Sequence, residues 1–396
     1  MQISGIICEY NPFHKGHEYL IKEAKKKSDA VVCVMSGHFT QRGEAAVADK
    51  FVRAKTALLG GADLVLELPF PFSASSASYF AAAGVKVLSM VGADTLVFGS
   101  ESGDLSRLSE LADYSLSEGF EKEKQATQAD KGSASAHFKA LLGEGERLLP
   151  NDILAVEYLR AIKKEGLPIT AQPIVRVGDG FGEKALGDSP YASATAIRAA
   201  LVQKSVDALG GYLPDFSLEE LKNALERGEA PVTMERAERA ILGFFRLTPP
   251  EQLLHIAGLG NGLEHRLCAS AKESGNLADL MRWCATKRYP DAAIRRAILA
   301  AMVGVTYADL DGGVAYTTVL GANTVGRELL ASFRKKNLPL LTKPSDIEGL
   351  CVAFPELAQD IRRQAMLAEK ADALYSLCLP KVAEAGKYLR GSAVML

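Results

Sequence analysis

Short apolar runs alternate with amphipathic stretches over the first two hundred residues. The apolar runs, which predict strands, lie at 3–8, 30–35, 63–68, 95–99 and 169–177. Apolar positions at helical spacing predict helices at 19–27, 49–61, 73–92, 150–162 and 191–203. Strands that are apolar on both faces and alternate with helices are typical of a parallel sheet covered on both sides. We therefore predict a doubly wound α/β domain with its ligands at the carboxyl ends of the strands.

Two later stretches depart from this pattern. Residues 113–148 are polar and rich in small residues, which predicts a solvated helix and a loop that lies over the site. Beyond about residue 205 helical periodicity dominates, with a short strand pair expected near 313–323. We predict an α/β catalytic domain over 1–205 and a mostly α-helical domain over 206–396.

Composition limits where a function can be sought. The 396 residues carry a net charge of −2, so binding of nucleic acid would need a local basic patch. The six cysteines form no CxxC pair, which indicates a reducing compartment and gives no zinc spacing. The first residues, MQISGIICEY, lack the pattern of a signal peptide, and no uncharged apolar run is long enough to span a membrane. We expect a cytoplasmic protein with no membrane partner and no dedicated metal site.

Two histidines follow the first strand directly, in the segment CEYNPFHKGH at 8–17. His14 and His17 are three residues apart at the start of a helix, so they share a face. The helix N-terminus attracts anions, and Gly16 allows a ligand to approach the backbone. Two imidazole donors here suit a triphosphate attacked at its α-phosphorus. The alternative is an ordinary polar turn.

A second segment, SATAIR at 193–198, closes the α/β pattern. Ser193 is placed to cap the helix that follows it. Thr195 and Arg198 would then face phosphate oxygens, and arginine is the stronger anchor. The alternative is a capped surface helix.

These segments together resemble the tRNA(Met) cytidine acetate ligase family, a branch of the HIGH nucleotidyltransferases. The resemblance rests on CEYNPFHKGH, VMSGHFTQRGEAA at 34–46, FGSESGD at 98–104, PNDILAVEYL at 150–159, SATAIR and TKRYPDAAIRRAIL at 286–299. It implies that ATP activates acetate as acetyl-adenylate with release of pyrophosphate. The acetyl group then passes to N4 of the wobble cytidine of elongator tRNA(Met). Mg²⁺ is expected to be carried by the phosphates.

The resemblance also implies an ATP site, with His14 and His17 as its catalytic residues. Its other residues would be Ile7, Cys8, Glu9, Tyr10, Asn11, Pro12, Phe13, Lys15, Gly16, Leu20, Gly99, Asn151, Arg176, Ser193, Thr195 and Arg198. Asn151 and Arg176 would touch the ribose or the phosphates. Their alternatives are a helix N-cap for Asn151 and a surface charge at a strand end for Arg176.

Two further segments are candidates for the acceptor substrate. SGHFTQRG at 36–43 follows the second strand, so His38, Gln41 and Arg42 would line the acetate pocket or the cytidine entry, unless the segment is only a polar turn. The basic segment at 282–296 would contact the tRNA backbone through Lys287, Arg288, Arg295 and Arg296. A solvated helix face would have the same composition. Arg334, Lys335 and Lys336 form a second, weaker basic candidate.

Other functions stay open on the sequence alone. A small-molecule adenylyltransferase of the same fold would use the same histidines, but it has little need for some 190 further residues with a basic cluster. A non-catalytic, nucleotide-sensing RNA binder would not need both histidines.

Overall fold

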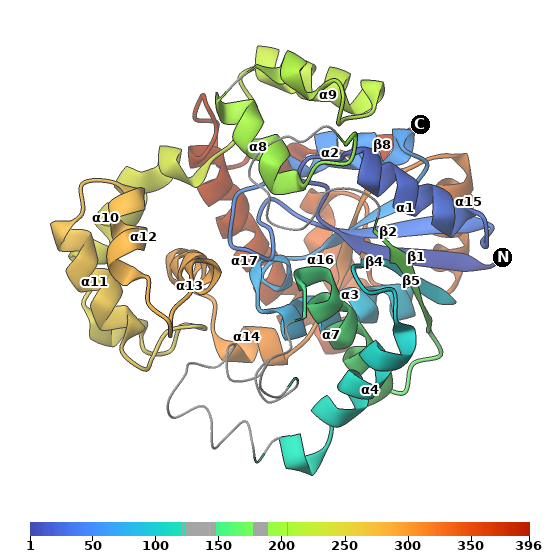
Figure 1. Ribbon diagram of the computed structural model, residues 1–396, viewed down its shortest axis with the longest axis horizontal. Coiled ribbons are helices and arrows are strands. Elements are labelled where there is room, and N and C mark those ends of the chain that lie inside the picture. Colours follow the sequence, from blue (N-terminus) through green and yellow to red (C-terminus); the bar gives the residue numbers. More distant parts are fainter. Residues whose placement is uncertain (121, 123–141, 143–147, 177–188, 204) are drawn as a thin grey trace.

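A mixed β-sheet runs through the centre of the protein (Figure 1). The computed structural model describes residues 1–120, 122, 142, 148–176, 189–203 and 205–396. The strands follow the order β5-β4-β1-β2-β3-β6-β7, and β8 also pairs with β6. Their bounds are β1 Ile3–Cys8, β2 Ala30–Ser36, β3 Leu64–Leu68, β4 Thr95–Ser100, β5 Thr170–Val175, β6 Thr317–Ala322, β7 Leu340–Leu341 and β8 Val394–Met395. The first five strands are parallel, which confirms the predicted sheet.

Alternate side chains of the central strands enter two separate cores. On one face Ile7, Val32 and Leu66 pack with α3 (Ala77–Met90) and α7 (Pro150–Lys164). On the other face Ile6 and Cys33 pack with α1 (Lys15–Lys25) and α2 (Lys50–Leu59). Because both faces are covered, the strands are apolar throughout and show no alternation in the sequence.

The strand order reverses between β1 and β4. The chain proceeds from β1 outward through β2 to β3, and then returns to the other side of β1 for β4 and β5. In doubly wound sheets the crevice at the carboxyl ends of such a pair is the usual ligand site. The segment after β1, which contains the two histidines, lies at this point.

Most predicted elements form, with shifted ends. The first helix begins at Lys15 and not at residue 19, because His14 caps it. The predicted helix at 73–92 forms as a short turn, Phe72–Ala74, followed by α3. A helix that was not predicted separately, α4 (Leu105–Ser115), follows β4. The remaining prediction for 113–148 falls largely outside the described residues, as does Val177 of the predicted strand 169–177.

The strand pair predicted near 313–323 is wrong in one respect. Only β6 forms there, and it lies antiparallel to β3 in the main sheet. Residues beyond 205 therefore contribute strands β6, β7 and β8 to the same sheet as β1 to β5. The sheet thus crosses the predicted boundary at residue 205.

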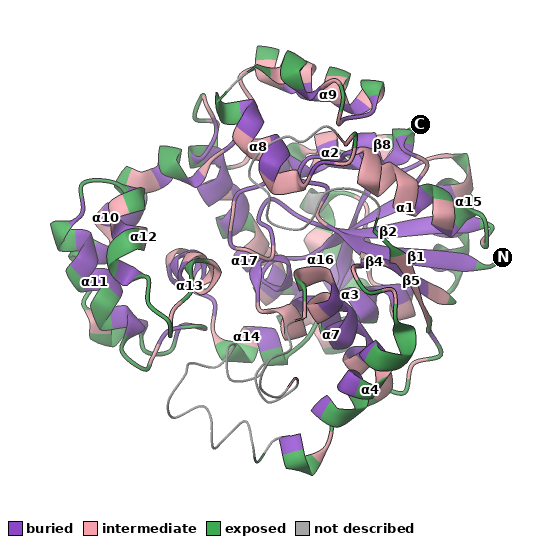
Figure 2. Cartoon of the chain, viewed as in Figure 1, coloured by how far each residue is buried: buried purple, intermediate pink, exposed green. Residues whose placement is uncertain are grey.

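Helices make up most of the second half, as predicted, and several form a lobe beside the sheet (Figure 1). Their outer surfaces are exposed, whereas the central strands β1, β2 and β3 are buried (Figure 2). None of the helices described is long and apolar enough to cross a bilayer. The remaining helices are α8 Ala194–Gln203, α9 Asp215–Glu226, α10 Glu238–Leu247, α11 Leu263–Glu273, α12 Leu277–Cys284, α13 Asp291–Val303, α14 Tyr307–Asp311, α15 Thr324–Lys335, α16 Ile347–Ala353 and α17 Ala358–Leu377.

Candidate active site

His14 and His17 form a reciprocal cap at the N-terminus of α1. The backbone N–H of Gly16 donates to Nδ1 of His14 at 3.1 Å. The backbone N–H of His14 donates to Nδ1 of His17 at 3.3 Å. The two rings stack with centroids 3.7 Å apart and an interplanar angle of 21°. Both side chains therefore have one orientation, fixed by backbone groups that the helix leaves unpaired.

Both imidazoles are neutral at physiological pH. Burial, with the nearby charges of Arg176 and Arg198, lowers the pKa of His14 to about 3. Burial, with His14 and Arg176, also lowers the pKa of His17 well below its ordinary value. A neutral imidazole carries one N–H, and Nδ1 is the acceptor in both rings. Each Nε2 therefore holds the proton and is the donor left for a ligand.

Buried aromatic rings pack against the histidine pair. The Tyr10 ring lies edge-on to Phe13 and His17, at 4.9 and 4.8 Å between centroids. Tyr10 and Phe13 are fully buried. Residues after α8 hold the same segment, because Ser217 donates to the carbonyl of Phe13 and Lys15 Nζ donates to that of Gly211. The predicted ATP segment is thus anchored from both halves of the chain.

Two of the predicted phosphate-binding arginines lie at this crevice. Arg176 is exposed at the end of β5, and its backbone N–H bonds to the carbonyl of Ser100. Its side chain passes beside Gly99, where an added Cβ would meet it at 3.4 Å. Arg198 donates to the carbonyl of Asn11 at 2.9 Å, so α8 reaches the histidine segment. Both arginines act on the His14 pKa, which places their charge near the pair.

The other predicted members of the ATP site have more local roles. Ser193 Oγ accepts from the N–H of Ala196, so the predicted helix cap is confirmed. Asn151 is not a helix N-cap, since α7 begins after Leu149. Its side chain donates to Glu101 at 2.6 Å and so fixes the turn after β4. Contact of these residues with ATP stays a prediction.

The loop from residue 36 to 46, here called the 36–46 loop, is joined to the histidine segment. The Gln41 N–H donates to the Glu9 carboxylate at 2.9 Å, and the Val47 N–H donates to Asn11 Oδ1 at 2.7 Å. Burial raises the pKa of Glu9, although Arg198 and Arg42 oppose that shift. The predicted loop therefore lies next to the ATP segment.

A buried arginine that the sequence reasoning missed fastens these segments together. Arg53 is 1% exposed and donates to the carbonyls of Glu9, Ser36, Gly37 and Ala48. These carbonyls belong to the segments after β1 and β2. The only sequence signal was a charged residue inside the apolar helix pattern at 49–61.

Helix α13 contacts the tip of the 36–46 loop. Gly43 has a φ of 72°, and an added Cβ would lie 2.7 Å from the backbone nitrogen of Arg296. Arg296 donates to the carbonyl of Gln41 at 3.1 Å, and burial lowers its pKa to about 10. Glu44 lies between Arg198 at 3.0 Å and Arg295 at 3.6 Å. The contact joins the helical half to the candidate ATP site.

These contacts correct the prediction of one basic RNA surface. Lys287 and Arg288 are exposed. Arg295 and Arg296 are half-buried and are held by the 36–46 loop, since Pro290 starts a helix that turns them toward it. Arg295 and Arg296 therefore do not share one exposed basic surface with Lys287 and Arg288.

The prediction for His38 also needs correction. Its side chain is 1% exposed and its Nδ1 lies 2.6 Å from Asp372 of α17. Its ring stacks on Tyr375 at 4.2 Å. Lys50 lies 3.3 Å from the same Asp372 and holds its pKa at about 2, against the effect of burial. His38 is therefore buried and does not lie at an exposed cytidine entry. Its Nε2 is buried without a hydrogen-bond partner among the described residues, and its contact with acetate stays a prediction.

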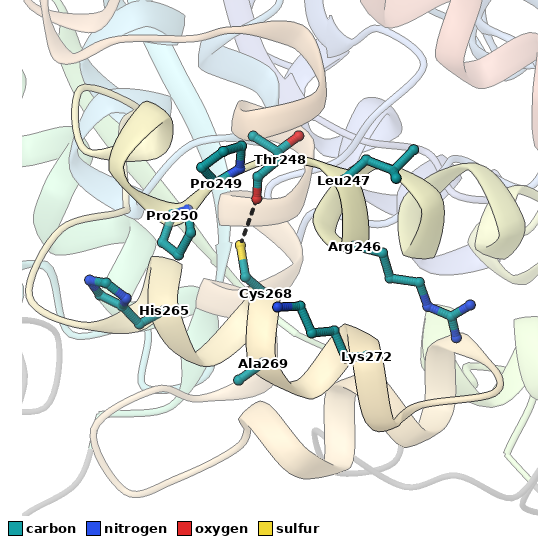
Figure 3. Close-up of a pocket in the computed structure, with 9 residues that line it drawn as sticks. All are labelled: Arg246, Leu247, Thr248, Pro249, Pro250, His265, Cys268, Ala269 and Lys272. Carbon is teal, nitrogen blue, oxygen red and sulfur yellow. Dashed lines mark hydrogen bonds between the residues drawn. The ribbon is translucent and has the colours of Figure 1, made fainter.

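A hollow of about 530 Å³ lies elsewhere, on α10 and α11 (Figure 3). Its lining includes Arg246, His265, Cys268 and Lys272 and none of the residues predicted to bind ATP. Among the residues that the structure describes, no group of three His, Cys, Asp or Glu side chains is arranged to hold a metal ion.

Comparison with known proteins gives one consistent result. The HIGH Nucleotidyl Transferase family model matches residues 1–388. A tRNA(Met) cytidine acetate ligase of Thermoanaerobacter sp. is 37% identical over 362 residues, covering 87% of this chain and 89% of that protein. The protein of the same name from Acetivibrio thermocellus is 33% identical over 100% of both chains.

Solved structures agree over the full length. Thermotoga maritima TmcAL bound with alpha-thio ATP has 32% sequence identity and a TM-score of 0.91, covering 100% of both chains. The apo form of that protein has a TM-score of 0.93 at the same identity and coverage.

Proposed function

Because this chain belongs to the HIGH nucleotidyl transferase family, and within it to the tRNA(Met) cytidine acetate ligases, we propose that it acetylates tRNA. Acetate and ATP form acetyl-adenylate and pyrophosphate. The acetyl group then passes to N4 of the wobble cytidine of elongator tRNA(Met), and AMP leaves. The observation that carries the proposal is the pair of oriented, neutral histidines at the strand-order reversal.

The histidines serve the first half-reaction. A carboxylate oxygen of acetate attacks the α-phosphorus, and charge grows on the phosphoryl oxygens as pyrophosphate departs. The Nε2–H groups of His14 and His17 donate to those oxygens. Neutral donors held in place need no reorganisation when the charge develops, and this is how such groups lower a barrier.

The positive charges around the pair hold the triphosphate. Arg176 approaches from the end of β5 and Arg198 from α8, while the N-terminus of α1 offers its dipole. Arg198 already bonds Asn11 and Glu44, so its guanidinium is oriented before ATP binds. We propose that ATP lies between these two arginines and the histidines.

Mg²⁺ would enter with ATP. Magnesium usually keeps several waters and is bound mainly through substrate phosphates, so a site made wholly by the protein is not needed. Full adenylation activity in excess chelator would contradict this part of the proposal.

The tRNA would lie against the helical half, with Lys287 and Arg288 on its phosphates. Arg295 and Arg296 would instead hold the 36–46 loop, next to the ATP segment. The acceptor cytidine would then be presented near that loop.

One incubation tests the function. The protein is mixed with labelled acetate, ATP and total tRNA, and the nucleosides of the recovered tRNA are analysed. We expect label in N4-acetylcytidine from elongator tRNA(Met), with AMP and pyrophosphate as the other products. Unlabelled RNA together with adenylylation of an added phosphate ester would instead indicate the adenylyltransferase alternative.

A further inference from the structure

Trp283 is the only tryptophan of the chain, and it lies on the surface. It is 53% exposed in the last turn of α12. That helix buries Leu277, Leu280 and Cys284, and Trp283 lies at the edge of this buried stripe. One exposed apolar side chain is not by itself evidence of a partner, so the residues around the indole decide what it can bind.

The surroundings of Trp283 are basic and fixed. The Arg282 guanidinium lies 5.6 Å from the centroid of the indole ring, and it also bonds Asp279 at 2.8 Å. Arg266 donates to the carbonyls of Trp283 at 2.6 Å and Cys284 at 3.1 Å. The end of α12 is thus held by a cross-helix arginine, and the ring is presented from a rigid turn.

Exposed cations follow immediately after it. Lys287 and Arg288 are exposed, and the Arg288 guanidinium lies 5.4 Å from the centroid of Tyr289. An exposed aromatic ring beside cations is the usual platform for single-stranded nucleic acid, because every base has a stacking face and every nucleotide a phosphate.

We propose that Trp283 stacks on an unpaired base of the tRNA while Lys287 and Arg288 contact the neighbouring phosphates. The inference rests on the proposed function, since it identifies part of the tRNA site. Helix α12, which carries Trp283, contacts α13, and α13 carries Arg295, the residue that meets Glu44 of the 36–46 loop. A base stacked there would help to place the tRNA relative to the 36–46 loop.

Intrinsic fluorescence tests the contact directly, because only Trp283 emits when tyrosine is not excited. We expect tRNA(Met) to quench this emission, and a blunt RNA duplex without unpaired bases to leave it nearly unchanged. Unchanged emission at saturating tRNA would overturn the proposal.

Binding measurements on variants separate stacking from charge. Trp283→Ala should weaken tRNA binding by roughly 5- to 150-fold, the range for loss of one stacked base, with an unchanged salt slope because no charge is removed. Trp283→Phe should recover most of the affinity. Leu247→Ala, at a side chain that is 86% exposed in the same lobe, is the matched control and should bind normally.

The outcomes also distinguish this inference from the proposed function. If the wild-type protein acetylates tRNA but Trp283→Ala binds it with full affinity, only the stacking inference falls. If Leu247→Ala loses as much affinity as Trp283→Ala, the effect is not stacking and the inference again falls. If the wild-type protein forms no acetylcytidine on any tRNA, the proposed function fails, whatever the fluorescence shows.

Discussion

His14 has two roles in this structure that one substitution can separate. Its Nδ1 caps α1 by accepting from Gly16, and its Nε2–H is the proposed donor to the α-phosphate. Asparagine is a good N-cap residue but is too short to place an N–H where Nε2 stands. His14→Asn should therefore keep the helix and lose the chemistry.

The expected magnitudes differ between the two readouts. Removing one donor of this kind costs on the order of 10²–10³ in rate, which corresponds to about 2.7–4 kcal/mol. Losing the cap costs only about 1 kcal/mol of folding stability. His14→Ala should show both losses, whereas His14→Asn should show the first and little of the second.

Acetate-dependent pyrophosphate exchange measures the adenylation step, and urea unfolding measures stability. His17→Asn and His17→Gln extend the comparison, since glutamine reaches closer to the position of Nε2. If His14→Asn exchanged pyrophosphate at nearly the wild-type rate, the imidazole would be a helix cap only, and the catalytic assignment would be refuted.

Four further outcomes are expected. Because the pKa of His14 is about 3 in the folded protein and 6.5 in the free side chain, the unfolded state binds more protons between these values, so stability falls as the pH drops from about 6.5 toward 3. Between pH 7.5 and pH 5 the protonation of His14 in the unfolded state should lower the free energy of unfolding by about 2 kcal/mol, and His14→Asn should lack this loss. Parallel curves of unfolding free energy against pH for the wild type and His14→Asn would contradict the prediction. Arg53→Met leaves four carbonyls, three of them buried, without their donor and should lower the free energy of unfolding by about 3–5 kcal/mol in urea titrations, whereas wild-type stability would show that the carbonyls find other partners. Replacing Lys287 and Arg288 with alanine should reduce the slope of log affinity for tRNA against log salt by about 1.4–1.8 and leave pyrophosphate exchange intact. Arg295→Ala, in contrast, should slow pyrophosphate exchange, because Glu44 then loses a partner beside Arg198. Equal exchange rates in Arg295→Ala and in the Lys287 and Arg288 variant would argue against that coupling.

The parts predicted well from the sequence depend on local pattern. The parallel strands were visible because each is a short apolar run between helices. The helix after β1 was visible from its apolar spacing, but its start was placed four residues late because a histidine cap was not expected. Both signals lie within a few residues of the feature that they predict.

The parts predicted badly depend on partners that are distant along the chain. The pairing of β6 with β3 joins residues about 250 positions apart, and no local pattern specifies the direction of such a pairing. The burial of His38 could not be predicted because Asp372, which makes that burial acceptable, lies 334 residues away. Arg295 looked like an RNA contact because Glu44 could not be identified as its partner from the sequence.

The antiparallel contact between β3 and β6 limits how the protein can be dissected. A fragment ending at residue 205 would keep β3, whose five residues are all buried, but would expose its backbone edge along the side that β6 covers. An uncovered and mostly apolar edge can recruit strands from other molecules, so the isolated catalytic half should aggregate instead of behaving as a free enzyme. The adenylation and tRNA-acetylation steps are therefore best separated by point substitutions in the intact chain. A shortened version would have to retain β6 or carry charged residues on the uncovered edge of β3.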